Sequence, residues 1–178
     1  MTHFIGNWMG DLAILEEWLR TIEYNTATSR MKKFGIKRSE GGSVFMGYTW
    51  MGYLSPTKQR EWCCLNKKFK TKLMSERPDL WSALEEFRDL YFPHFDFTGV
   101  QLNYNYKIGR HKDANNVGES VLVSCGDYTG GLTCVEMDDG TIQKFDARTN
   151  PVVFDGAKFF HYVEPFEGER FSVVFFRD

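Results

Sequence analysis

From residue 98 onward, the sequence is a close succession of short β-branched or aromatic runs with no helical pattern between them. The runs are GVQLNYNY, SVLVSC, GLTCVEM, TIQKFD, PVVFD, KFFHYVEP and RFSVVFF, separated by turn signals such as Asp139-Gly140 and Asp155-Gly156. Strands at this spacing indicate an antiparallel sandwich or barrel. Several runs are apolar on both faces, which predicts a sheet that lines its own interior on one side and is covered by helices on the other.

The sequence before residue 97 supplies those helices. We predict one helix capped by Asp11 and running to about Ile22, and a second opened by Ser55-Pro56. A third is expected to begin at Pro78 and end before Pro93, because apolar residues recur there at helical spacing. The glycine- and aromatic-rich segment 30–53 is interpreted as strands and loops. We therefore expect one α+β domain over residues 1–178, with helical support segments in 1–96 and a β-rich part in 97–178.

Composition limits the partners and the compartment. The net charge of −2 gives no general attraction to nucleic acid or to anionic membranes. Basic clusters at 30–38 and 67–72 keep nucleic acid open as a partner, although solvated surface is the favoured interpretation. We find no signal peptide and no apolar run long enough to span a bilayer. The four cysteines form no C-x-x-C motif, which favours reduced thiols in a cytoplasmic protein.

Three side chains suggest a metal site. His111 and Asp113 lie two residues apart, so they can face the same way at a strand end, and His161 shares a strand face with apolar neighbours. Two imidazoles and one carboxylate form the set that leaves coordination positions open in non-heme Fe(II) oxygenases.

The last strand carries a second unusual feature. Strand alternation puts Arg170, Ser172, Val174 and Phe176 on one face. An inward guanidinium is costly to bury without an anion. Glu167 or Glu169 could supply that anion, and so could a bound carboxylate ligand.

The ordered set H-x-D, then His161, then R-x-S nine residues later resembles the Fe(II)/2-oxoglutarate-dependent dioxygenase superfamily, in particular its prolyl-hydroxylase-like and nucleic-acid-oxygenase-like branches. The segments GDYTGGLTCVE and VVFDGAKFFHYVEPFEGERFSVVFF are similar to that family as well, and the resemblance covers about residues 97–178. It implies a double-stranded β-helix, or jelly-roll, core with the N-terminal helices packed on the outer face of one sheet.

The resemblance also implies roles for the site residues. His111, Asp113 and His161 would bind Fe(II), and Arg170 with Ser172 would bind the distal carboxylate of 2-oxoglutarate. The segment NYNYKIG is similar to the strand that supplies Asn or Tyr contacts to this co-substrate, with Tyr104 and Tyr106 as candidates. The choice among Asn103, Tyr104, Asn105 and Tyr106 stays open.

The implied activity is that of an enzyme that uses O2 to couple decarboxylation of 2-oxoglutarate to succinate with hydroxylation or oxidative demethylation of a C–H bond, with ascorbate as a supporting reductant. The substrate could be a nucleobase, a peptide side chain or a small metabolite, and Asn115, Asn116 and Glu119 are candidates to contact it. The alternative is a non-catalytic or 2-oxoglutarate-independent cupin-like protein, although the glycine-rich, histidine-rich cupin motifs are not found.

Overall fold

The computed structural model describes residues 3–24, 29–37, 40–49 and 69–178. The helices are α1 (Trp8–Arg20), α2 (Ser29–Phe34), α4 (Lys72–Glu76) and α5 (Pro78–Tyr91). The strands are β1 (Gly42–Thr49), β2 (Phe69–Lys70), β3 (Gly99–Tyr104), β4 (Ser120–Cys125), β5 (Tyr128–Gly130), β6 (Thr133–Glu136), β7 (Ile142–Phe145), β8 (Val152–Phe154), β9 (His161–Val163), β10 (Phe166–Gly168) and β11 (Phe171–Phe176).

The strands form antiparallel sheets. A six-stranded sheet has the order β2-β1-β3-β11-β4-β8, a three-stranded sheet the order β7-β6-β9, and β10 pairs with β5. Every strand pairing in these sheets is antiparallel. The predicted combination of helices with antiparallel sheets is confirmed, and each predicted run after residue 98 contains a strand. The short strands β5 and β10 were not predicted, because their glycines gave only turn signals.

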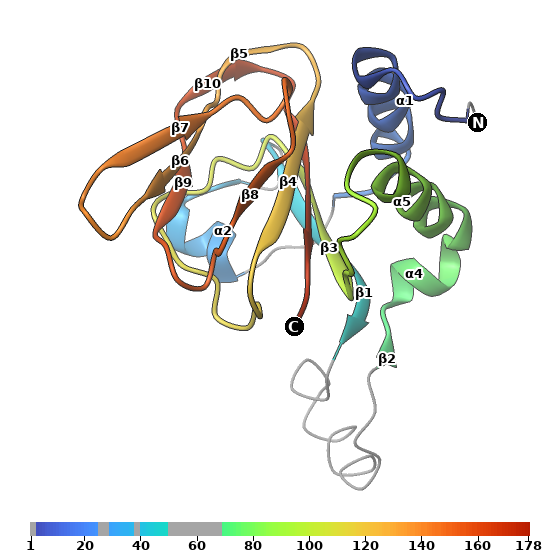
Figure 1. Cartoon of the computed structure of the whole chain (residues 1–178), viewed down its shortest axis with the longest axis horizontal. Helices are drawn as coiled ribbons and strands as arrows, with labels where there is room; N and C mark the ends of the chain where they lie inside the picture. The colour runs from blue at the N-terminus through green and yellow to red at the C-terminus, as the bar shows by residue number, and fades with distance from the viewer. Residues whose placement is uncertain (1–2, 25–28, 38–39, 50–68) are drawn as a thin grey trace, which may run out of the picture.

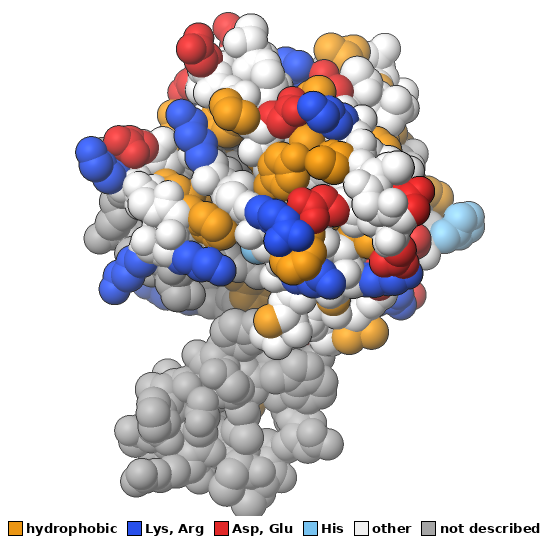
Figure 2. All heavy atoms as spheres, turned by 90° about the vertical axis from the view of Figure 1, so that its left-hand side faces the viewer, with side chains coloured by type: hydrophobic (Ala, Val, Ile, Leu, Met, Phe, Trp, Pro, Cys, Tyr) orange, Lys and Arg blue, Asp and Glu red, His pale blue; other side chains and the backbone are white. Residues whose placement is uncertain are grey.

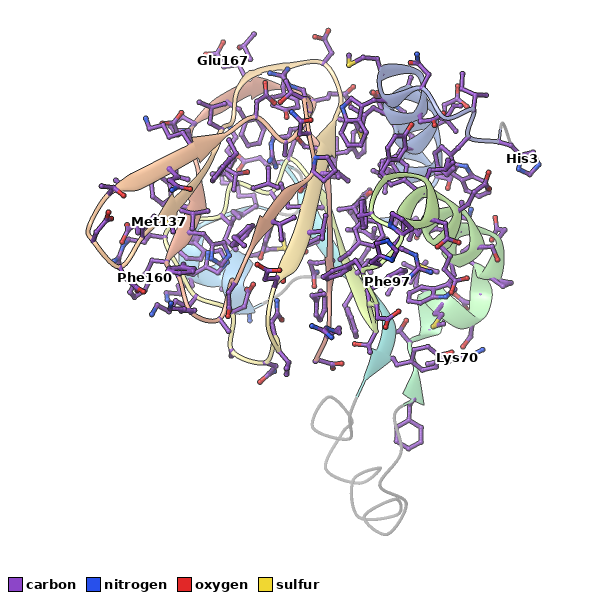
Figure 3. All side chains as sticks on the ribbon, viewed as in Figure 1. His3, Lys70, Phe97, Met137, Phe160 and Glu167 are labelled. Carbon is purple, nitrogen blue, oxygen red and sulfur yellow. The ribbon has the colours of Figure 1, made fainter. Side chains whose placement is uncertain are left out.

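Helices α1, α4 and α5 lie on one side of the six-stranded sheet, and the smaller sheets lie on the other (Figure 1). The helix side is a continuous apolar cluster in which Leu84 and Phe87 of α5 and Val173 and Phe175 of β11 are fully buried. The labelled Phe97 lies between the sheet and the helices (Figure 3). Burial of this much apolar surface is the main stabilising term of the fold.

The helix that was predicted from Pro78 is confirmed as α5, which ends at Tyr91. The predicted cap of the first helix is wrong, because the N-cap is Asn7, whose side chain accepts a hydrogen bond from the Gly10 amide. Asp11 is buried one turn further on. Its carboxylate accepts hydrogen bonds from the amides of residues 5 and 6 and from the Tyr91 hydroxyl, at 2.7, 2.8 and 2.6 Å. Asp11 thus ties the N-terminal segment to both helices.

The segment 30–53 contains an expected strand, β1. Its first residues, however, belong to helix α2, which was not predicted. Helix α2 ends at Phe34, whose ring lies against Gly109 and 6.3 Å from the His111 ring, centroid to centroid. A tertiary contact of this kind overrides weak local propensity in a helix of only six residues. The helix predicted at Ser55-Pro56 lies outside the described residues.

Two further expectations can be compared with the structure. Cys125 and Cys134 are buried and form no disulfide, in agreement with the prediction, whereas Cys63 and Cys64 lie outside the described residues. Among the helices that the structure describes, none is long and apolar enough to cross a membrane.

Candidate active site

The two histidines of the predicted metal site lie directly opposite each other. The amide of His111 donates to the carbonyl of His161 at 3.0 Å, and the amide of His161 donates back at 2.9 Å. The two rings therefore sit side by side, with centroids 4.2 Å apart. A separate backbone bond, from the Asp113 amide to the Gly156 carbonyl at 2.8 Å, brings the carboxylate to the same place.

Backbone carbonyls determine which ring nitrogen of each histidine faces the carboxylate. The Nδ1 of His111 lies 2.8 Å from the Gly109 carbonyl, and the Nδ1 of His161 lies 3.1 Å from the Phe159 carbonyl. Because a carbonyl oxygen only accepts, both Nδ1 atoms carry the proton in the neutral imidazole. The lone pairs are then on the Nε2 atoms, as is required of metal-binding imidazoles. The sequence did not reveal these orienting carbonyls.

The donor atoms fit a single small metal ion. The Oδ1 of Asp113 lies 3.6 Å from the Nε2 of His111, and its Oδ2 lies 3.7 Å from the Nε2 of His161. All three ligand atoms lie within 4.8 Å of one another, and both histidines are buried. Ligand atoms at 2.0–2.2 Å from an ion are at most about 4.4 Å apart, so these separations suit a shared ion after a small adjustment. The donor set is the one typical of non-heme Fe(II).

Two neighbours hold the Asp113 carboxylate in position. The side-chain amide of Asn116 donates to Oδ2 at 3.1 Å and also donates to the Ser120 hydroxyl at 3.2 Å. Gly156 lies so close that a Cβ there would be 2.5 Å from Oδ2 and 3.3 Å from the Cε1 of His161. Asn116, proposed from the sequence as a substrate contact, is thus a neighbour of the metal site, whereas Glu119 is exposed.

The three residues open into a cavity of about 1030 Å³, which also contains Tyr106, Arg170 and Ser172 in its lining. The predicted alternation of β11 is confirmed. Arg170, Ser172, Val174 and Phe176 line this cavity, whereas Phe171, Val173 and Phe175 belong to the helix-side cluster.

Arg170 is the most unusual residue of the cavity. Its side chain is 2% exposed, and its Nε and Nη2 atoms have no hydrogen-bond partner among the described residues. The nearest aromatic contacts of its guanidinium are the rings of Tyr128 and Phe166, at 5.5 and 5.7 Å. Desolvation by burial lowers the pKa of this guanidinium below its ordinary value. A buried cation with unsatisfied donors is a site for an anion.

Neither of the two carboxylates considered from the sequence pairs with Arg170. The Glu169 carboxylate instead forms an ion pair with Arg20 at 2.8 Å and accepts a hydrogen bond from the Tyr104 hydroxyl at 3.1 Å. Glu167 is exposed and points outward at the end of the smaller sheets (Figure 3). The remaining possibility raised by the sequence is a bound carboxylate ligand.

The four candidates in NYNYKIG lie on different sides of the sheet. Tyr104 is not among the cavity-lining residues and packs in the helix-side cluster, with its ring 4.9 Å from that of Phe171. Asn105 turns the chain with a φ of 44° and accepts from the Arg170 amide. Tyr106 and Asn103 line the cavity. The co-substrate role suggested for Tyr104 does not agree with this placement, because strand alternation turns it away from the cavity.

The outer surface near His111 and strand β9 carries both positive and negative side chains. Lys112 points away from the metal site, with its Nζ 4.6 Å from the Phe160 ring centroid, and Arg110 pairs with Glu136 at 2.7 Å. Figure 2 shows this side of the molecule, with Lys and Arg side chains spread over it and Asp and Glu side chains among them. In the described part of the basic cluster 30–38, Lys32 and Lys33 are exposed.

No protein-family model matches the sequence, and no curated protein matches it. Solved structures do match. A prolyl-4-hydroxylase from Pseudomonas putida aligns over 96% of this chain and 85% of its own, with 17% identity and a TM-score of 0.50. NgTET1, in complex with 5mC DNA, aligns over 93% of this chain and 67% of its own, with 15% identity and a TM-score of 0.52.

An oxidoreductase of the 2OG-Fe(II) oxygenase family from Burkholderia pseudomallei also aligns, with 23% identity and a TM-score of 0.46. That alignment covers 61% of this chain and 60% of the other. The chain has the fold of the 2-oxoglutarate-Fe(II) oxygenases, and the resemblance that the sequence indicated is confirmed at that level.

Proposed function

We propose that this protein is an Fe(II)- and 2-oxoglutarate-dependent oxygenase. It would use O2 to couple decarboxylation of 2-oxoglutarate to succinate with hydroxylation, or oxidative demethylation, of a substrate C–H bond. The observation that carries the proposal is the buried Arg170, whose unsatisfied donors line the same cavity as His111, Asp113 and His161. A dicarboxylate fits this pairing, since one end can meet the guanidinium while the other end lies at the metal.

Each of these residues has a defined task. His111, Asp113 and His161 would hold Fe(II), and when bound Fe(II) supplies the oxygen chemistry of the reaction. The Gly109 and Phe159 carbonyls keep the imidazoles in the ligating tautomer. Arg170 would bind the distal carboxylate of 2-oxoglutarate, with Ser172 beside it. Tyr106, which is buried and lines the cavity, would border the co-substrate.

We further propose that the sheets form the double-stranded β-helix of this fold, with residues 97–178 as the catalytic part and residues 1–96 as support and substrate segments. The two solved structures compared above, a prolyl hydroxylase and a protein in complex with DNA, leave peptide and nucleic-acid substrates both under consideration. The mixed charge around Lys112 favours neither of them, and small metabolites also stay open.

The test is succinate formation by purified protein given Fe(II), 2-oxoglutarate, ascorbate and O2. We expect slow turnover without added substrate that Asp113→Ala abolishes, because it removes the one carboxylate of the metal site. The control is Asp138→Ala, a change to an exposed carboxylate paired with Lys158 on the surface, which should keep full turnover.

Succinate formation that persists in Asp113→Ala would contradict the assignment of the metal site. A protein that binds the metal but neither binds nor turns over 2-oxoglutarate would instead support the cupin-like alternative. A screen of methylated oligonucleotides, peptides and metabolites for stimulated succinate release would then identify the substrate class.

A further inference from the structure

We infer that Asn103 is a positioning residue that makes the Ser172 hydroxyl a hydrogen-bond donor toward the carboxylate held by Arg170. This inference rests on the proposed function and deepens it. Of the four NYNYKIG residues, Asn103 would then act on the co-substrate through Ser172, beside Tyr106 in the cavity lining.

The starting observation is a row of polar residues across the sheet, three of which, Ser43, Asn103 and Ser172, line the cavity. In the sheet register, Ser43 of β1 pairs with Asn103 of β3, Asn103 pairs with Ser172 of β11, and Ser172 pairs with Ser124 of β4. All four side chains are at least nine-tenths buried. Four polar residues in one buried row are unusual in a sheet whose opposite face is apolar throughout this region.

Hydrogen bonds fix the orientation of the Asn103 amide. The Gln101 side-chain amide donates to the Ser43 hydroxyl at 2.5 Å, and that hydroxyl donates to the Oδ1 of Asn103 at 2.6 Å. A Ser hydroxyl has a single proton, so Ser43 directs it to Asn103 while it accepts from Gln101. With its oxygen occupied in this way, Asn103 can offer only its NH2 group on the other side.

That NH2 group determines the role of Ser172. The Nδ2 of Asn103 donates to the Oγ of Ser172 at 3.2 Å. Ser172 therefore accepts from Asn103, and its own proton is available for another acceptor. Arg170 lies two residues earlier on the same strand face, so an anion at the unsatisfied Arg170 donors is beside this hydroxyl. The row makes Ser172 a donor next to a cation, which suits a carboxylate.

The test is a double-mutant cycle read by direct binding. The probe is 2-oxoglutarate, titrated under anaerobic conditions into protein loaded with Mn(II), with the dissociation constant as the readout. Loss of a hydrogen bond to a charged group predicts about ten-fold weaker binding for Ser172→Ala. We expect Asn103→Ala to weaken binding by about the same factor. The double variant should have about the same dissociation constant for 2-oxoglutarate as either single variant.

The result that would overturn the inference is additivity. If Asn103 contacted 2-oxoglutarate itself, the double variant would bind about a hundred-fold more weakly than the unmodified protein, the product of the two single effects. Unchanged binding in Asn103→Ala would also overturn it. Ser43→Ala frees the Asn103 amide to rotate, so it should weaken binding by a few-fold and have no effect once Ser172 is alanine.

Controls separate this role from a general loss of structure. Thr133→Val removes another buried hydroxyl, one without a hydrogen-bond partner among the described residues and outside the cavity lining, and should leave binding unchanged. Asn103→Ser, a smaller polar residue without an amide, is the second variant should Asn103→Ala not fold. If the unmodified protein itself fails to bind 2-oxoglutarate, the proposed function fails, which is a different outcome from an additive cycle.

Discussion

The two faces of β11 differ sharply although they alternate residue by residue along one strand. Phe171, Val173 and Phe175 are buried in the hydrophobic cluster between the sheet and the helices. Ser172 on the other face, and Arg170 directly before the strand, are buried just as deeply in the cavity, where the Nε and Nη2 of Arg170 have no hydrogen-bond partner among the described residues. The helix face stabilises the fold, while the cavity face carries a charge that a folded protein would be more stable without.

This contrast shows that the candidate site lies on the opposite face of the strand from the residues that stabilise the fold. A period of two lets neighbouring residues of one strand serve stability and binding separately. We expect ligand binding to depend on the polar half, where donors of Arg170 that have no partner among the described residues can bind an anion. Changes on the two faces should therefore separate stability from binding.

The largest effect is expected on the helix face. Phe175 is fully buried, with its ring centroid 5.0 and 5.1 Å from those of Phe92 and Phe97, so Phe175→Ala should lower the free energy of unfolding by about 3–5 kcal/mol. Denaturant titration measures it. Phe176→Ala is the matched control on the partly exposed cavity face and should cost about 1 kcal/mol. Equal losses at the two positions would remove the distinction between the faces.

The second effect concerns Arg170. Arg170→Met keeps an unbranched side chain about as long as the aliphatic part of arginine and removes the charge, so 2-oxoglutarate should bind about a hundred-fold more weakly. The free energy of unfolding should stay the same or rise, because an unsatisfied buried cation is lost. Calorimetric titration and denaturant unfolding measure the two quantities. A large loss of stability with unchanged binding would mean that the guanidinium has a structural role.

The smallest effect concerns the support of the metal site. A Cβ at Gly156 would displace the Oδ2 of Asp113, so Gly156→Ala should weaken Mn(II) binding by about ten-fold with little change in unfolding. Gly10→Ala in α1 is the glycine control, because its Cβ would meet no atom closer than 3.4 Å. That variant should leave metal binding unchanged. Undiminished affinity in Gly156→Ala would show that the carboxylate is not held where the structure places it.

Much of this organisation followed from local patterns. The strands after residue 98 were predicted because β-branched and aromatic runs alternate with turn residues, and α5 because its apolar residues recur at helical spacing. Asp11 was misread, since nothing local shows that residues 5 and 6 fold back onto its carboxylate. Helix α2 was missed for the same reason: its Phe34 packs on Gly109, distant in the sequence.

The site divides in the same way. The residue types of His111, Asp113 and His161 predicted a metal site, and the ordered set that ends at Ser172 suggested 2-oxoglutarate through its resemblance to a known family. The sequence could not tell Tyr104 from Tyr106, or show that Asn103 meets Ser43 and Ser172, because side-chain neighbours across a sheet depend on strand order and register. The sequence by itself determined which groups were available and, for the last strand, which face each of them occupied. The tertiary structure alone decided which of them meet, because only the assembled sheet brings β1, β3 and β11 side by side.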